Sequence, residues 1–103
     1  KEYPTNWSWE NWVGINFIAE AAKKATSADG KKIAEAMRGL KIDCPFGTDG
    51  TVTMRADDQT VIGYAIGWGT TIPQEPYVPE VKGATWDTIL QLEAEWKKRN
   101  NYT

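Results

Sequence analysis

Residues 3–9 bring together side chains that could bind a small ligand. The segment reads Tyr-Pro-Thr-Asn-Trp-Ser-Trp and places three aromatic and three hydrogen-bonding side chains directly before a predicted helix. The first amides of a helix are unpaired and its N-terminal end is positive, so this position attracts an anion. Aromatic walls beside it would suit a ligand with an apolar body and a carboxylate. The alternative is packing. Trp9 begins the apolar stripe of the helix, which favours packing, whereas Trp7 lies outside that stripe and both interpretations stay open.

Several aspartates could be read as a carboxylate cluster for a metal or for acid–base chemistry. They are Asp43, Asp49 and the pair Asp57-Asp58. A calcium loop needs oxygens at a set spacing, as in D-x-D-x-D-G, and the sequence lacks that pattern. Asp57 and Asp58 fall between two predicted strands, where solvated turn residues are common. We therefore predict turn residues and no metal site.

Nucleophilic catalysis is not expected. The sequence has no histidine, which excludes a Ser-His-Asp triad, a Cys-His pair and an imidazole metal site. Its one cysteine, Cys44, lies in an alternating stretch beside Pro45 and is predicted to be a small apolar residue that is buried or half-buried. No carboxylate or hydroxyl has a recognisable activating partner, so we expect neither an enzyme nor a bound cofactor.

The composition narrows the possible partners. The chain has 103 residues, 12 basic and 14 acidic side chains, and a net charge of −2, which gives no electrostatic footprint for nucleic acid. No apolar run reaches the roughly 20 residues that span a bilayer. Six tryptophans stand out in an otherwise ordinary acidic composition.

Two helices are predicted in the first half of the chain. The first begins near Ser8 or Trp9, with Asn6 or Ser8 as its cap, and runs to about Ala25. Its apolar residues occupy more than one stripe along the helix. A chain of 103 residues has few other elements that could cover all of these stripes. The second helix, of about ten residues, is capped by Ser27 or Asp29, and Gly39 ends it. Such closely joined helices should form an antiparallel hairpin.

Strands are predicted next. Residues 41–44 and 51–55 alternate in polarity and are separated by the turn dipeptide Asp49-Gly50. Residues 61–72 form the longest strand candidate, and the glycines within it predict a bend, a bulge or a close approach to another backbone. A proline-rich loop over 73–79 leads to a last helix over 85–100, capped by Thr85. The fold class is α+β, in the order helix, helix, strands, helix.

Three further tryptophans have packing as their preferred interpretation. Trp68 lies among glycines in a strand, where core packing is favoured over a sugar-binding or aromatic site. Trp86 and Trp96 belong to a helical apolar stripe and are predicted to be core residues.

Several stretches follow one another in a characteristic order. They are Tyr3-Pro4 with the Trp-rich helix start, Ala21-Ala22-Lys23-Lys24-Ala25, Asp29, Ala36-Met37-Arg38-Gly39-Leu40, Pro45-Phe46-Gly47, Asp49-Gly50-Thr51-Val52-Thr53-Met54-Arg55 and Asp57-Asp58-Gln59. In this order they resemble the C-terminal part of a periplasmic solute-binding protein of the branched-chain amino acid (Leu/Ile/Val-binding-like) ABC transporter family. The resemblance extends over essentially the whole chain and rests on the order of the stretches.

The resemblance implies a longer protein with the type I periplasmic binding fold. Two α/β lobes would hold a small ligand between them, and residues 1–103 would be a C-terminal fragment, mostly of one lobe. Trp7 matches an aromatic position that touches the ligand, with Asn6, Ser8 and Trp9 as neighbours. The doubled Trp-x-Trp departs from the smaller pattern of many amino acid binders, which leaves room for an aromatic or other organic acid. The implied partner is a membrane permease, and the implied location is periplasmic.

An alternative of a different class is a free-standing, aromatic-rich module that binds carbohydrate or peptide. Such a module would be monomeric and ligand-competent by itself. A fragment would expose apolar surface and self-associate or exchange elements to cover it.

Overall fold

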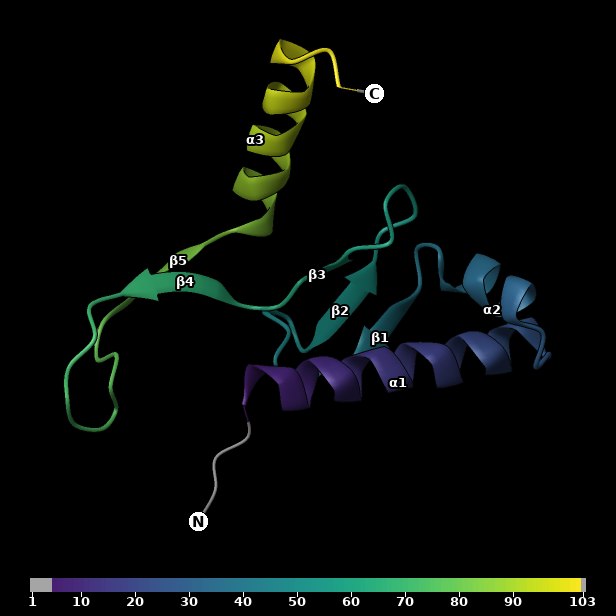
Figure 1. Ribbon diagram of the computed structural model, residues 1–103, viewed down its shortest axis with the longest axis horizontal. Helices are drawn as coiled ribbons and strands as arrows, with labels where there is room; N and C mark the ends of the chain where they lie inside the picture. Colours follow the sequence, from purple (N-terminus) through teal and green to yellow (C-terminus); the bar gives the residue numbers. More distant parts are fainter. Residues whose placement is uncertain (1–4, 103) are drawn as a thin grey trace. The chain divides into compact units, whose positions relative to one another are not determined.

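The computed structural model describes residues 5–102 and confirms the α+β class (Figure 1). Tyr3 and Pro4, which open the aromatic segment, lie outside the described residues. The chain divides into two compact units, one ending at Tyr64 and the other beginning at Ala65. The elements of the first unit are α1 (Asn6–Ala25), α2 (Gly30–Met37), β1 (Lys41–Asp43), β2 (Thr51–Met54) and β3 (Val61–Ile62). Those of the second are β4 (Ile66–Gly69), β5 (Val81–Ala84) and α3 (Trp86–Arg99).

Helix α1 begins earlier than the sequence predicts. Its cap is Thr5, which has an extended backbone and whose side chain makes no capping hydrogen bond. The predicted caps Asn6 and Ser8 therefore lie inside the first turn. The helix ends at Ala25, as predicted, because Thr26 takes a left-handed conformation with φ 49°.

Helix α2 follows the sequence signals closely. Asp29 caps it by accepting hydrogen bonds from the amides of Lys31 and Lys32, at 3.1 and 3.0 Å. Gly39 lies just past its end with φ 67°, a conformation that glycine adopts without strain. The chain reverses between the two helices, and α2 packs against α1 as a helical hairpin (Figure 1).

The first unit contains a three-stranded antiparallel sheet in the order β1-β2-β3. Ile42 pairs with Val52, and Met54 pairs with Val61. The predicted strand over 61–72 is split because Gly63, with φ 103°, turns the chain after β3. A side chain there would meet the Thr51 carbonyl oxygen at 3.1 Å, so the turn also requires close backbone approach.

The core lies between α1 and this sheet. It consists of Val13, Phe17, Ile42, Cys44 and Val52, all at most 6% exposed. The prediction for Cys44 is confirmed, since the thiol side chain is buried among apolar neighbours. Trp9, Leu40, Met54, Val61 and Tyr64 pack around this core and are half-buried.

The second unit is an antiparallel hairpin followed by a helix. In the hairpin Trp68 lies opposite Lys82, and a side chain at Gly69 would collide with the Glu80 carbonyl oxygen. The sequence analysis does not predict β5. Thr85 caps α3 as predicted, accepting a hydrogen bond from the Thr88 amide at 3.3 Å.

The prediction that α3 buries two tryptophans is wrong for Trp96 and holds only in part for Trp86. No side chain of α3 is buried. Trp86 is half-buried, and Trp96 is 49% exposed with its ring centroid 5.6 Å from that of Tyr102. Helical periodicity marks an apolar stripe correctly, but burial also requires a surface to pack against, and no side chain of the hairpin is buried either.

Candidate ligand-binding surfaces of helix α1

The four predicted ligand-binding residues all lie within the first turn of α1, and their side chains leave the helix in different directions. Successive residues of an α-helix are rotated by about 100°, so Trp7 and Trp9, two residues apart, point in directions that differ by about 160°. Trp7 is 75% exposed, whereas Trp9 is half-buried against the core. The structure therefore brings Asn6 and Trp9 together and separates both from the Trp7 indole.

Trp9 is held by polar and aromatic neighbours. Its indole Nε1 donates a hydrogen bond to Asn6 Oδ1 at 2.8 Å, and Asn6 Nδ2 donates to Glu10 Oε1 at 3.4 Å. The Trp9 ring centroid lies 5.5 Å from that of Phe46 and 5.6 Å from that of Tyr64, in tilted arrangements. Trp9 can therefore pack against the core, as the sequence favours, and still line the edge of a binding site.

Ser8 lies at the exposed start of the helix. Its hydroxyl is 3.2 Å from that of Thr5, within hydrogen-bonding distance. This contact joins two exposed side chains of the first turn, and Ser8 is not among the residues that line the two hollows described next.

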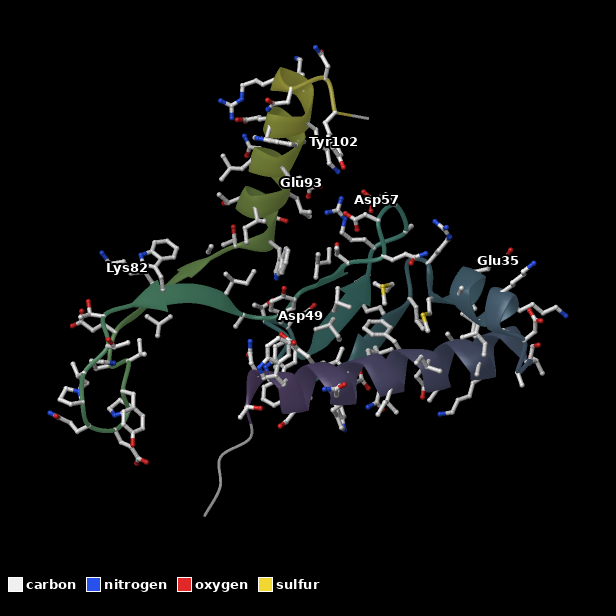
Figure 2. The ribbon with its side chains drawn as sticks, in the orientation of Figure 1. Glu35, Asp49, Asp57, Lys82, Glu93 and Tyr102 are labelled. Atoms are coloured by element: carbon white, nitrogen blue, oxygen red, sulfur yellow. The ribbon has the colours of Figure 1, made fainter. Side chains whose placement is uncertain are left out.

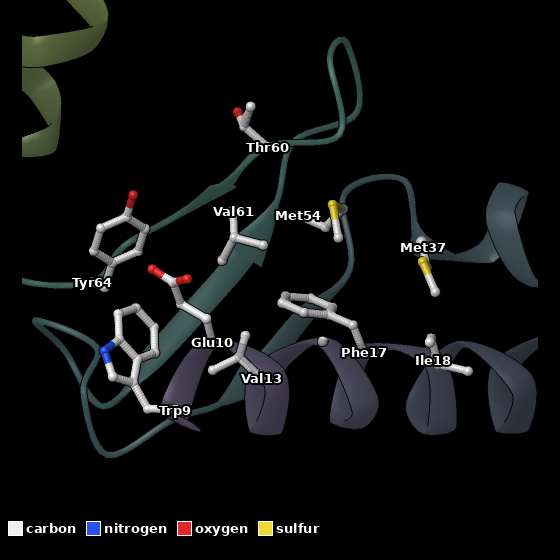
Figure 3. A pocket seen from close by; sticks show the side chains of 11 residues that line it. Trp9, Glu10, Val13, Phe17, Ile18, Met37, Met54, Thr60, Val61 and Tyr64 are labelled. Atoms are coloured by element: carbon white, nitrogen blue, oxygen red, sulfur yellow. The ribbon is translucent and has the colours of Figure 1, made fainter. Parts of the chain in front are cut away.

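A hollow of about 510 Å³ lies between α1 and the β2–β3 part of the sheet (Figure 3). We call it the Trp9 hollow. Its volume falls within the range of about 300–1,000 Å³ that small-molecule sites occupy. Its walls are mainly apolar, with the Glu10 carboxylate and the hydroxyls of Thr60 and Tyr64 as polar groups. The lining residues are Trp9, Glu10, Val13, Gly14, Phe17, Ile18, Met37, Met54, Thr60, Val61 and Tyr64.

The sequence analysis does not find the Trp9 hollow. It is built from α1, the end of α2, β2 and the chain from Thr60 to Tyr64, which the strand register brings together. The pairing of Met54 with Val61 places two of its walls side by side. That register depends on how β2 and β3 meet, and the alternation of residue types alone does not fix it.

A shallower hollow of about 420 Å³ surrounds Trp7, and we call it the Trp7 hollow. Asn11 Nδ2 donates a hydrogen bond to the Trp7 carbonyl oxygen at 2.7 Å within it. Glu10, Gly14 and Ile18 line both hollows and so form the ridge between them. The full lining is Trp7, Glu10, Asn11, Gly14, Ile15 and Ile18.

The sides of α1 that face away from the core keep apolar residues in contact with water. Ile15 is 67% exposed, Ile18 52% and Trp12 45%. This exposure is expected from the sequence, because apolar residues occupy more of the helix than a short chain can cover. Over residues 5–102, α1 is covered on one side only.

Asp49, Asp57 and Asp58 lie in turns, as predicted, whereas Asp43 is the last residue of β1. Figure 2 labels Asp49 and Asp57. Arg55 forms ion pairs with both Asp57 and Asp58, and its hydrogen bonds to Asp57 lower the pKa of the Asp57 carboxyl. Hydrogen bonds from the Thr51 hydroxyl and from Lys41 lower the pKa of Asp49 to about 2. Within the described part of the chain, no three acidic or cysteine side chains are grouped so that they could hold a metal ion.

Trp68 is not packed in a core, although core packing is the favoured prediction for it. Its side chain is 62% exposed on β4, beside Gly67 and Gly69. The aromatic-site interpretation of Trp68 therefore stays open.

Across residues 5–102, none of the helices combines the length and apolar character needed to cross a membrane. Comparison of the chain with protein-family models, with curated proteins and with solved structures finds no match.

Proposed function

We propose that the chain is the C-terminal portion of an extracytoplasmic solute-binding protein that serves an ABC transporter. The proposal rests on the order of sequence stretches that resemble that family. The observation that supports it best is the incomplete cover of α1, because a helix with apolar side chains on several faces belongs in the interior of a larger α/β lobe.

The energetics of α1 favour further cover. Val13 and Phe17 are buried on one side, while Ile15, Ile18 and Trp12 meet water. Full burial of a large aliphatic side chain stabilises a protein by about 1.5–3 kcal/mol relative to exposure. Packing α1 on a sheet contributed by the rest of a lobe would recover, for each of these side chains, the part of this free energy that corresponds to its exposed surface.

Trp7 is the residue that we assign to the ligand. It lies in the first turn of α1 with most of its indole exposed, and the Thr5 side chain leaves the first amides of the helix uncapped. An aromatic surface beside the positive end of a helix suits an amino acid-like or organic-acid ligand. Capture would proceed by closure of two lobes on the ligand, followed by delivery to a permease in the membrane. No covalent chemistry and no cofactor are required, and the proposed location is the periplasm.

The test uses the intact product of the open reading frame that contains these residues. Calorimetric titration with aromatic and aliphatic amino acids and with aromatic carboxylic acids should identify a ligand bound one to one. Trp7→Ala should then weaken its binding by at least about tenfold. Trp96→Ala, which removes an exposed tryptophan from α3, is the matched control and should leave the affinity unchanged. Affinity within twofold of the parent in Trp7→Ala would contradict the assignment, as would an open reading frame that starts near Lys1.

The second candidate is a free-standing module that binds carbohydrate, and the exposure of Trp68 favours it. A flat indole between two glycines is accessible to a sugar ring. On this alternative the 103 residues alone bind oligosaccharides as a monomer, and Trp68→Ala abolishes binding while Trp7→Ala does not. The opposite response of these two variants distinguishes the two functions.

A further inference from the structure

We propose that the Trp9 hollow binds a small molecule with an apolar, aromatic-sized body and a cationic amine. This site goes beyond the proposed function, because it lies across the Glu10–Gly14–Ile18 ridge from the Trp7 indole. The two sites can therefore be tested separately.

The walls of the hollow determine the apolar part of the ligand. Val13 and Phe17 form the side that belongs to the core, and Val61 faces them from β3 (Figure 3). Met37 and Met54 complete the wall near α2. Methionine side chains are flexible and polarisable, so they adapt to ligands of irregular shape and make favourable contacts with aromatic rings.

The mouth of the hollow determines the charge of the ligand. Among the eleven lining residues Glu10 alone carries a charge. Its carboxylate accepts a hydrogen bond from Asn6, which is itself fixed by the Trp9 indole N–H. Figure 3 shows Glu10 extending from α1 towards Tyr64, beside the Trp9 ring.

These groups together favour a cation over an anion. A carboxylate beside an apolar cavity attracts an ammonium group and repels another carboxylate. The faces of Trp9 and Tyr64 add a cation–π attraction of about 0.5–1 kcal/mol for a cation at an exposed mouth. The Trp9 hollow is thus matched to an amine.

The two methionines provide a direct readout. Met37 and Met54 are the only methionines in the chain, and both line the hollow. A chain labelled with ¹³C at the methionine methyl groups gives two signals, each of which reports on the site. The probes are 2-phenylethylamine and 3-phenylpropionate, which share a phenyl body and differ in charge, with 2-phenylethanol as the neutral reference.

We expect 2-phenylethylamine to shift both methyl signals in a saturable way. The titration is carried out at low salt and at a chain concentration at which sedimentation shows a single oligomeric species. The affinity for 2-phenylethylamine should exceed that for 3-phenylpropionate by at least about tenfold. Equal affinities for the amine and the acid would overturn the proposal, and so would methyl signals that do not move with either probe. Methyl signals that do not move are also expected if the Trp9 hollow is filled by a helix or strand of a protein and not by a small molecule.

Variants of Glu10 test the source of the preference. Glu10→Gln should bring the amine and the acid to within about twofold of each other, and Glu10→Lys should reverse the preference. The matched control is Glu20→Gln, which removes a carboxylate of the same helix that pairs with Lys23 and does not line the hollow. The role of this carboxylate would be refuted if Glu10→Gln still preferred the amine by tenfold. The two methyl signals of the free variant must then lie where they lie in the unsubstituted chain, which shows that the hollow is intact.

Trp7→Ala separates this proposal from the proposed function. Trp7 does not line the Trp9 hollow, so its removal should leave both the methionine shifts and the amine preference unchanged. Loss of the amine response in Trp7→Ala would overturn the assignment of the ligand to the Trp9 hollow, whatever the result of the solute-binding titration.

Discussion

Asp49 organises the turn between β1 and β2 through a group of short polar contacts. Its carboxylate accepts hydrogen bonds from the Thr51 amide at 3.1 Å, the Thr51 hydroxyl at 2.6 Å and Lys41 Nζ at 3.2 Å. These donors favour the ionised carboxylate, and the pKa of Asp49 falls from 3.8 to about 2. Because the pKa is lower in the folded state, the contacts contribute stability above pH 3.8 and lose it as the pH falls towards 2.

We predict that the side-chain carboxyl ¹³C resonance of Asp49 titrates with a midpoint near pH 2. Thr51→Val removes the hydroxyl donor and should raise that midpoint towards 3.8. Thr60→Val is the matched control, because the Thr60 hydroxyl bonds to Asp58 and not to Asp49. An unshifted midpoint of 3.8 in the parent chain would contradict the hydrogen-bond account.

The candidate site could be predicted from sequence only at the level of residue types. The enrichment of aromatic and polar side chains at residues 6–9 is visible in the sequence, and Asn6 and Trp9 do meet. The sequence analysis starts the helix at Ser8 or Trp9, which would leave Trp7 in a loop beside Trp9. The observed start at Asn6 rotates the two indoles apart, so an error of two or three residues in a helix boundary changes which side chains lie together.

At the scale of elements, capping signals predict two of the three helices well. Asp29 and Thr85 each have an extended backbone and accept a hydrogen bond from a first-turn amide. Asn6 fails as a predicted cap because its side chain instead bonds to Trp9 and Glu10 inside the helix. Local competition between capping and side-chain contacts cannot be resolved from residue type alone.

The capping geometry gives a stability prediction. Asp29→Ala removes the acceptor of two amide hydrogen bonds and should lower the free energy of unfolding by about 1 kcal/mol. Thr5→Ala is the comparison, because Thr5 makes no capping bond, and it should change stability by less than about 0.5 kcal/mol. Urea denaturation at one chain concentration measures both. Equal effects of the two substitutions would show that the side-chain cap of α2 is not a source of stability.

The strands show where sequence patterns stop being sufficient. The predictions for residues 41–44 and 51–55 match β1 and β2 to within one residue at their ends. The pattern over 61–72 is continuous in sequence but is divided by Gly63, where close approach to the Thr51 backbone forces the turn. β5 has a glycine and only one β-branched residue, so it depends on pairing with β4 and leaves little local signal.

At the scale of the whole molecule, burial is uneven along the chain. Within residues 5–102, every buried side chain falls between Val13 and Val52, and none belongs to the second unit. The α+β class was predictable because it depends on the periodicity of apolar residues. The uncovered faces of α1 were predictable because the helix has more apolar residues than so short a chain can cover. The Trp9 hollow was not, because it arises from how α1 and the sheet pack.

The claim on which the proposed function depends is that α1 is built to be covered by protein beyond these 103 residues. Sedimentation velocity over a range of chain concentrations tests it most directly. We predict a mass above 11.6 kDa that rises with concentration, because the exposed side of α1 associates in the absence of its natural cover. Ile15→Glu should shift the chain towards monomer, whereas Thr70→Glu, which adds the same charge in an exposed loop, should not. A chain that remains monomeric up to about 100 μM and unfolds in one sharp transition would contradict the claim.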